Sequence, residues 1–188
     1  MTDRETVTIR SRAELRAWLG AHHTRTDGIW LATYKKHHPD HVPWIEAIEE
    51  LLCWGWVDAV TRKVDENRSA HLVAPRKETS AWSALNKELI QKARAAGAMT
   101  EAGEAKISAA VRNGMWTFLD DVEAGLVPDD LDAALGDLRA VWDAWPRSVR
   151  RGTLEWIKTA KTAPTRAKRI ADVAESAAAG LRPSPFRR

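Results

Sequence analysis

The chain has 188 residues, of which 44% are hydrophobic and 29% are charged, and its formal net charge at pH 7 is +3. These values are typical of one globular domain with one core, and they exclude the disordered, collagen-like and coiled-coil classes. Because no run of about 20 apolar residues and no apolar signal-peptide stretch occurs, we expect no membrane insertion and a cytoplasmic location.

The N-terminal half predicts an α+β core. In chain order we expect a strand at 7–9, a helix at 11–22, a strand at 29–34, a helix at 43–55 and a hairpin of strands at 56–60 and 71–74. Ser11 and Glu14 have the spacing of a capping box, and Pro43 and Gly55 suit the two ends of the second helix. This order predicts a small, mostly antiparallel sheet with helices on one face.

The C-terminal half predicts helices only. We expect them at 82–96, 100–113, 129–135, 137–145, 148–160 and 164–179. The fold class is therefore α+β, with an all-helical C-terminal half. We predict a core at 1–98 that includes the first of these helices, a helical region at 99–180 packed on it, and a disordered tail at 181–188.

Charge is unevenly distributed in the C-terminal half. Residues 101–145 carry 3 basic and 10 acidic side chains, whereas 146–188 carry 11 basic and 3 acidic ones. A basic stripe could bind the phosphates of nucleic acid, but the two segments can also screen each other in the fold. We favour mutual screening of the two segments. Nucleic acid is then a less expected partner, and its binding stays an open alternative. The stripe comprises Arg147, Arg150, Arg151, Lys158, Lys161, Arg166, Lys168 and Arg169.

Several segments resemble the signatures of a known family. Residues 54–58 (Trp-Gly-Trp-Val-Asp) are similar to an aromatic-Gly-Trp-Ile-Asp signature, and 74–86 contain similar Pro-Arg, Ser-x-Trp-Ser and Asn elements. Further similarities lie at 97–103, 155–157, 160–161, 165–166 and 169–170. On these motifs the chain resembles the YdeI/OmpD-associated (OmdA, bacteriocin-protection) family. The resemblance implies a bacterial protein linked to bacteriocin protection or to a porin, and it implies no reaction. Ala59 departs from the glycine that the family often has.

The candidate site lies between the predicted hairpin and the helix that follows it. A loop rich in Arg, Lys and Ser that leads into a helix N-terminus combines cations with free backbone N–H groups, which suits phosphates and carboxylates. The sequence therefore predicts a small anionic ligand or a partner protein here. In the structural alternative, Ser80 or Ser83 caps the helix, Arg76 pairs with Asp58, and the tryptophans fill the core. The candidate residues are Asp58, Arg62, Arg76, Lys77, Ser80, Trp82, Ser83 and Asn86.

Three functions remain open: a binding or stress-protection module, an enzyme, and a nucleic-acid-associated protein. In the enzyme hypothesis, Asp58 is the acid/base and Arg76 holds an anion in a Trp-lined pocket. No serine-hydrolase, P-loop or dinucleotide motif occurs. We therefore favour a non-enzymatic binding module and assign no catalytic residue and no cofactor. The sequence leaves the oligomeric state open.

The remaining reactive side chains predict no metal site or catalytic thiol. His37, His38 and His41, with Asp40 between them, lie in a loop without zinc-like spacing, so we expect solvated residues. Cys53, the only cysteine, excludes an internal disulfide. We expect it to be a buried structural residue.

Overall fold

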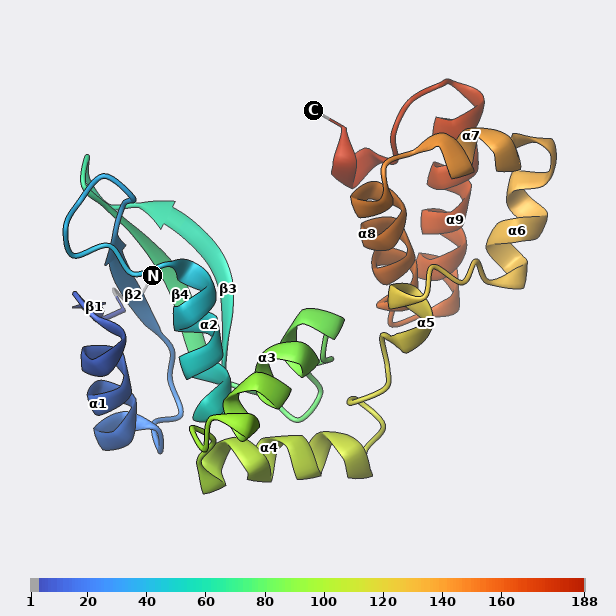
Figure 1. Ribbon diagram of the computed structural model, residues 1–188. Helices are drawn as coiled ribbons and strands as arrows, with labels where there is room; N and C mark the ends of the chain where they lie inside the picture. The colour runs from blue at the N-terminus through green and yellow to red at the C-terminus, as the bar shows by residue number, and fades with distance from the viewer. Residues whose placement is uncertain (1–3, 188) are drawn as a thin grey trace. The chain divides into compact units, whose positions relative to one another are not determined.

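The predicted alternation of strands and helices in the N-terminal half is confirmed by the computed structural model, which describes residues 4–187 (Figure 1). Its elements are β1 (Thr6–Thr8), α1 (Arg12–His22), β2 (Ile29–Tyr34), α2 (Trp44–Cys53), β3 (Trp56–Lys63), β4 (Arg68–Pro75), α3 (Ala84–Ala95) and α4 (Glu101–Arg112). The sheet order is β1-β2-β4-β3, with β1 parallel to β2 and the other pairs antiparallel. The expected α+β class and mostly antiparallel sheet are therefore correct.

Helix α2 lies between two apolar clusters. On one side, Leu51 packs with Leu15 and Leu19 of α1 and with Leu31 and Val73 of the sheet. The other cluster joins α2 to α3 and α4, and its buried members are Leu52, Trp82, Leu89, Ile90, Ile107 and Ala110. Because both sides of α2 are covered, its Glu49 and Glu50 are also buried and need partners within the protein.

The hairpin is longer than predicted, because its turn is closed by a side chain. The Asp65 carboxylate accepts the N–H groups of Asn67 and Arg68, at 2.9 and 2.7 Å, and the pairing of β3 with β4 extends to Lys63 and Ser69. The strand register also shifts between Asp58 and Thr61. Periodicity alone does not reveal such a side-chain-closed turn.

The helix ends follow their predicted signals, with one difference. Ser11 accepts the N–H of Glu14 as expected, but the Glu14 carboxylate returns to the N–H of Arg10 at 2.7 Å instead of that of Ser11. After α2, Gly55 has a φ of +72°, a conformation that favours glycine. This turn leads directly into β3.

The rest of the described chain is helical. It contains α5 (Asp120–Glu123), α6 (Asp129–Leu135), η1 (Gly136–Leu138), α7 (Arg139–Ala144), α8 (Arg147–Lys158), α9 (Ala163–Ala178) and η2 (Ser184–Phe186). Helix α9 packs against α6 and α8. No helix within residues 4–187 is long and apolar enough to cross a membrane.

The chain divides into two compact units between Phe118 and Leu119. Helix α4, which the sequence placed in the C-terminal region, belongs to the first unit, because Thr100 at its start donates from its hydroxyl to the Cys53 carbonyl at 2.6 Å. The segment 181–187, expected to be a loose tail, contains η2, and Ser184 donates its N–H to Asp172 at 2.9 Å. Residue 188 lies outside the described residues.

Candidate functional site

Arg76, the central cation of the predicted site, is buried, with only 3% of its surface exposed. Its guanidinium lies over Trp82, 3.6 Å from the ring centroid, and its Nη2 donates to the Ala81 carbonyl. Among residues 4–187, its Nε and Nη1 have no hydrogen-bond partner, and no ion pair joins it to Asp58. Burial lowers the pKa of Arg76 to about 10, although the charge of Asp58 acts in the opposite direction.

The polar residues around the start of α3 bond mainly to one another. Ser83 accepts the N–H of Asn86, and the Asn86 side chain accepts the N–H of Ser83, which forms a capping box. Ser80 donates its N–H to the Lys77 carbonyl in a turn, and the Lys77 side chain is exposed. The cap is therefore a structural feature of α3.

Asp58 and Arg62 make their contacts on different elements. Asp58 accepts a hydrogen bond from Trp44 Nε1 at 3.2 Å. The Arg62 guanidinium lies 4.1 Å from the centroid of Trp30 and donates to the Thr6 hydroxyl at 3.2 Å. Four of the predicted site residues therefore lie close together, namely Arg76, Trp82, Ser83 and Asn86. Arg62 instead contacts Thr6 of β1 and Trp30 of β2.

Arg76 permits a direct test of its role. We expect Arg76→Met to change the free energy of unfolding by less than about 1 kcal/mol, because methionine fills similar space and removes a charge with unpaired donors. Arg76→Ala should cost about 2–4 kcal/mol, because it leaves a cavity beside Trp82. Urea denaturation of both variants measures the difference. An equal, large loss in both variants would mean that the buried charge itself stabilises the fold.

The other reactive side chains have structural surroundings. His41 Nδ1 lies 2.7 Å from the Tyr34 carbonyl, and His37 Nε2 lies 3.1 Å from Asn67 Oδ1. No group of three or more metal-ligand residue types occurs within residues 4–187. Cys53 is buried as expected, and burial raises the pKa of its thiol to about 11, which disfavours the reactive thiolate.

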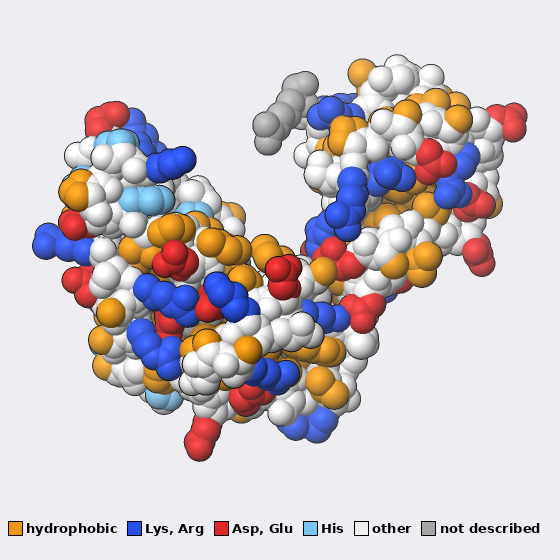
Figure 2. Space-filling view, in the orientation of Figure 1, with side chains coloured by type: hydrophobic (Ala, Val, Ile, Leu, Met, Phe, Trp, Pro, Cys, Tyr) orange, Lys and Arg blue, Asp and Glu red, His pale blue; other side chains and the backbone are white. Residues whose placement is uncertain are grey.

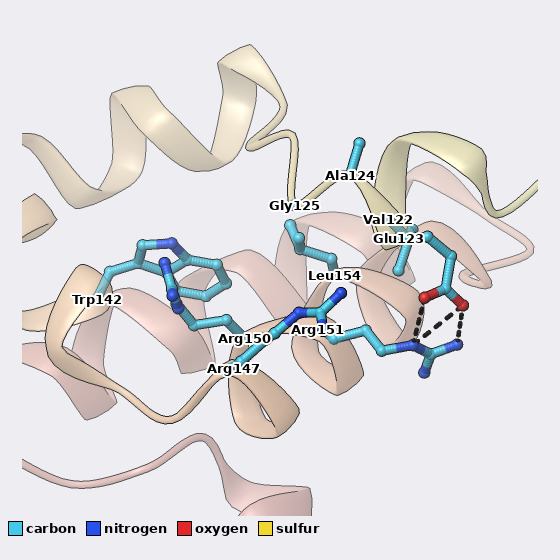
Figure 3. Close-up of a pocket in the computed structure, with 9 residues that line it drawn as sticks. All are labelled: Val122, Glu123, Ala124, Gly125, Trp142, Arg147, Arg150, Arg151 and Leu154. Carbon is cyan, nitrogen blue, oxygen red and sulfur yellow. Dashed lines mark hydrogen bonds and ion pairs between the residues drawn. The ribbon is translucent and has the colours of Figure 1, made fainter. Parts of the chain in front are cut away.

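The second unit contains a cavity that the sequence did not predict. Its volume is about 240 Å³, and we call it the arginine pocket. Figure 3 shows the arginine side chains of α8 on one wall, with Trp142 towards one end and Glu123 towards the other. The residues that line the pocket are Val122, Glu123, Ala124, Gly125, Trp142, Arg147, Arg150, Arg151 and Leu154.

The three arginines of the pocket differ in how far they are neutralised. Arg151 forms ion pairs with Glu123 and Glu155, each at 2.7 Å. Arg150 has one longer ion pair, 3.5 Å to Asp143, and its Nε is buried without a hydrogen-bond partner among residues 4–187. Within the same residues, no ion pair or side-chain hydrogen bond involves Arg147. Positive charge therefore remains uncompensated at the Arg147 and Arg150 end.

The end of α5 and the start of α8 determine where two walls of this pocket lie. Gly125, with a φ of +71°, ends α5, because its N–H donates to the Val122 carbonyl and the N–H of Leu126 donates to the Asp121 carbonyl. Helix α8 begins after Pro146, which provides no side-chain cap. The positive end of the α8 dipole therefore adds to the charge of the arginines beside it.

The acidic and basic segments of the C-terminal half pair with each other within the second unit. The pairs are Arg151 with Glu123 at 2.7 Å, Lys158 with Asp121 at 2.6 Å, Arg166 with Asp130 at 2.7 Å and Arg150 with Asp143 at 3.5 Å. The expected screening is thus present at these positions. Ion pairs therefore hold four of the eight cations of the basic stripe, and Arg147 at the pocket is one of the four that make no ion pair within residues 4–187.

The sequence contained one signal of this pocket. Arg147, Arg150 and Arg151 are spaced three and four residues apart, which places them on one side of a helix. The opposite wall comes from α5 and α7, and no local pattern indicates that these helices lie there. The arginines were therefore assigned to a basic stripe.

Comparison with known proteins gives two family matches. The family described as "Domain of unknown function (DUF8412)" matches residues 7–106, and "Bacteriocin-protection, YdeI or OmpD-Associated" matches residues 126–180. No curated protein and no solved structure matches the chain. The predicted resemblance is confirmed for 126–180, whereas the motifs at 54–58 and 74–86 lie in the segment that the first family matches. Five of the nine residues that line the arginine pocket lie in the segment 126–180, and the other four directly precede it.

Proposed function

This chain belongs to the DUF8412 family, which spans more than half of it, and it carries a YdeI/OmpD-associated segment; we propose that it is a binding protein for a small anionic group. In this proposal the arginine pocket holds a phosphate or a carboxylate. The protective role named in the description of the second family then depends on binding and not on catalysis.

The observation that carries the proposal is the incomplete neutralisation of Arg147 and Arg150 in a concave site. A guanidinium presents several N–H donors in a planar arrangement that matches the oxygens of carboxylates and phosphates. Arg147 is exposed and makes no ion pair within residues 4–187, and the Arg150 side chain keeps 36% of its surface exposed, so both side chains can offer N–H donors to an anion. An anion at this position would also face the positive end of α8.

The size of the pocket limits the ligand. A volume of about 240 Å³ is below the roughly 300–1,000 Å³ of sites that enclose drug-sized molecules. The pocket therefore suits one charged group and not a whole nucleotide. Four of the eight cations of the basic stripe are held in ion pairs, which leaves fewer free cations for an extended phosphate backbone.

Isothermal titration of the full chain with inorganic phosphate and with glutarate at low ionic strength tests the proposal. We expect Arg150→Ala to weaken binding about 10- to 100-fold, because a charge-assisted hydrogen bond contributes about 1.5–3 kcal/mol. Lys168→Ala is the matched control, since it removes one exposed positive charge of α9 outside the pocket. Binding of neither anion, or an equal loss in both variants, would contradict a specific site.

A further inference from the structure

The second unit has two further hollows with largely apolar walls, and one of them adjoins the arginine pocket. The first, which we call the apolar pocket, has a volume of about 250 Å³ and is lined by Leu126, Val127, Pro128 and Ile157 among others. It shares the side chains of Val122 and Leu154 with the arginine pocket, so these two residues form the ridge between them. Leu126 is 62% exposed, an unusual position for a large apolar side chain.

The second hollow, which we call the alanine pocket, lies between α6 and α9. Its volume is about 410 Å³, and Ala134, Ala163, Ala167, Ile170 and Ala171 contribute most of its wall. It shares Arg166 with the apolar pocket. Figure 2 shows apolar side chains next to Lys and Arg side chains on the visible face of this unit. Shared lining residues therefore link the three hollows in a series, with the arginine pocket at one end and the alanine pocket at the other.

We propose that this series is a peptide-binding groove, in which an acidic side chain or a terminal carboxylate enters the arginine pocket and apolar side chains occupy the other two pockets. The inference rests on the proposed function, because it uses the same anion site. Charge complementarity determines the orientation of the bound peptide, because its acidic group lies at Arg147 and Arg150.

The residues that separate the three pockets favour a peptide over a single acyl chain as the ligand. Val122 and Leu154 separate the first two pockets, and the ion pair of Arg166 with Asp130 stands where the apolar and alanine pockets meet. Separate pockets suit separate side chains, as in other peptide-recognition grooves. The charged pair between two apolar pockets also offers donors and acceptors to a peptide backbone, which an acyl chain cannot use.

Fluorescence anisotropy with labelled hexapeptides tests the groove on the full chain. The probe has four leucines followed by two glutamates. One control replaces the glutamates by glutamines and has an amidated C-terminus, so that it carries no carboxylate, and the other replaces the leucines by serines. We expect the probe to bind at least about tenfold more tightly than either control, since each control peptide lacks one of the two complementary contacts.

Variants separate the groove from the anion site. Leu126→Ser should weaken binding of the leucine-glutamate probe about 5- to 10-fold, because part of its buried apolar contact is lost, and should leave glutarate binding unchanged. Leu181→Ser is the matched control, because Leu181 is another exposed leucine of this unit outside the three pockets. It should change neither affinity.

The possible failures are distinguishable. If glutarate binds but the leucine probe binds no better than the serine control, the groove is disproved and the anion site stands. If neither glutarate nor any peptide binds, both proposals fall. If decanoate binds with the same dependence on Leu126 while the peptide does not compete with it, the occupant is an acyl chain and the peptide assignment is wrong.

Discussion

Replacing Arg12 by alanine is expected to lower the free energy of unfolding by about 3–5 kcal/mol, because it leaves buried carboxylates without a bridging cation. Arg12 Nη2 donates to Glu49 at 2.8 Å, and its Nε donates to Glu50 at 2.9 Å. Glu50 is only 1% exposed, and Glu49 is also buried. Lys92 forms an ion pair with Glu49 at 2.7 Å, and Arg16 forms one with Glu50 at 2.6 Å. Within residues 4–187, only Arg12 contacts both carboxylates.

The matched control for this variant is Arg10→Ala. Arg10 is an exposed neighbour with one ion pair, 3.9 Å to Asp40, so its loss should cost less than about 1 kcal/mol. Urea denaturation at pH 7 gives both values. A similar, small effect in the two variants would mean that Lys92 and Arg16 suffice to compensate the buried carboxylates. Arg12→Lys should recover only part of the loss, because an ammonium group cannot bond to both carboxylates in the same planar geometry.

The network also predicts a pH dependence. Burial by itself would raise the pKa of Glu49, but the hydrogen bonds from Lys92 and Arg12 outweigh it and lower the pKa below the usual 4.5. The stability that this group contributes is thus present above pH 4.5 and is lost as the pH falls through the lowered pKa. We therefore expect acid unfolding of Arg12→Ala, followed by circular dichroism, to have its midpoint at a higher pH than that of the unchanged protein.

Gly103→Ala is expected to lower the free energy of unfolding by about 2–3 kcal/mol, although alanine has the higher helix propensity. A Cβ at this position would lie 2.8 Å from the carbonyl carbon of Cys53 and closer still to its oxygen. These are backbone atoms of the end of α2, which cannot rotate away. Helix α4 would therefore have to move from α2, and Thr100 would lose its hydrogen bond to the Cys53 carbonyl.

Gly152→Ala in α8 provides the matched control. The three atoms nearest to its Cβ would all belong to the ring of Phe186, the first at 2.7 Å, and that side chain can turn aside. The gain in helix propensity then offsets most of the cost, so we expect a change within about 1 kcal/mol. Thermal and urea denaturation of both variants test the difference. Equal effects would show that the α2–α4 contact adapts as easily as the Phe186 contact.

The sequence predicted the elements better than the site. Local signals were sufficient where structure depends on near neighbours: Pro43 and Gly55 bound α2, and Ser11 caps α1. Ser83 and Asn86 were assigned to an anion site with a cap as the alternative, and the structure shows the cap. What the sequence could not show is that the guanidinium of Arg76 is removed from water, because burial depends on segments that are distant in the chain.

By itself, then, the sequence determined the α+β class, the order of its helices and strands, and the opposite charges of 101–145 and 146–188. Tertiary structure alone decided which of these charges are compensated. Arg12 meets Glu49 across 37 positions of the chain, and Arg151 meets Glu123 across 28. Such pairs form because the packing of apolar helix faces fixes which polar side chains become neighbours. Where that packing supplies no carboxylate, as at Arg147, the positive charge stays available for the anion that we propose.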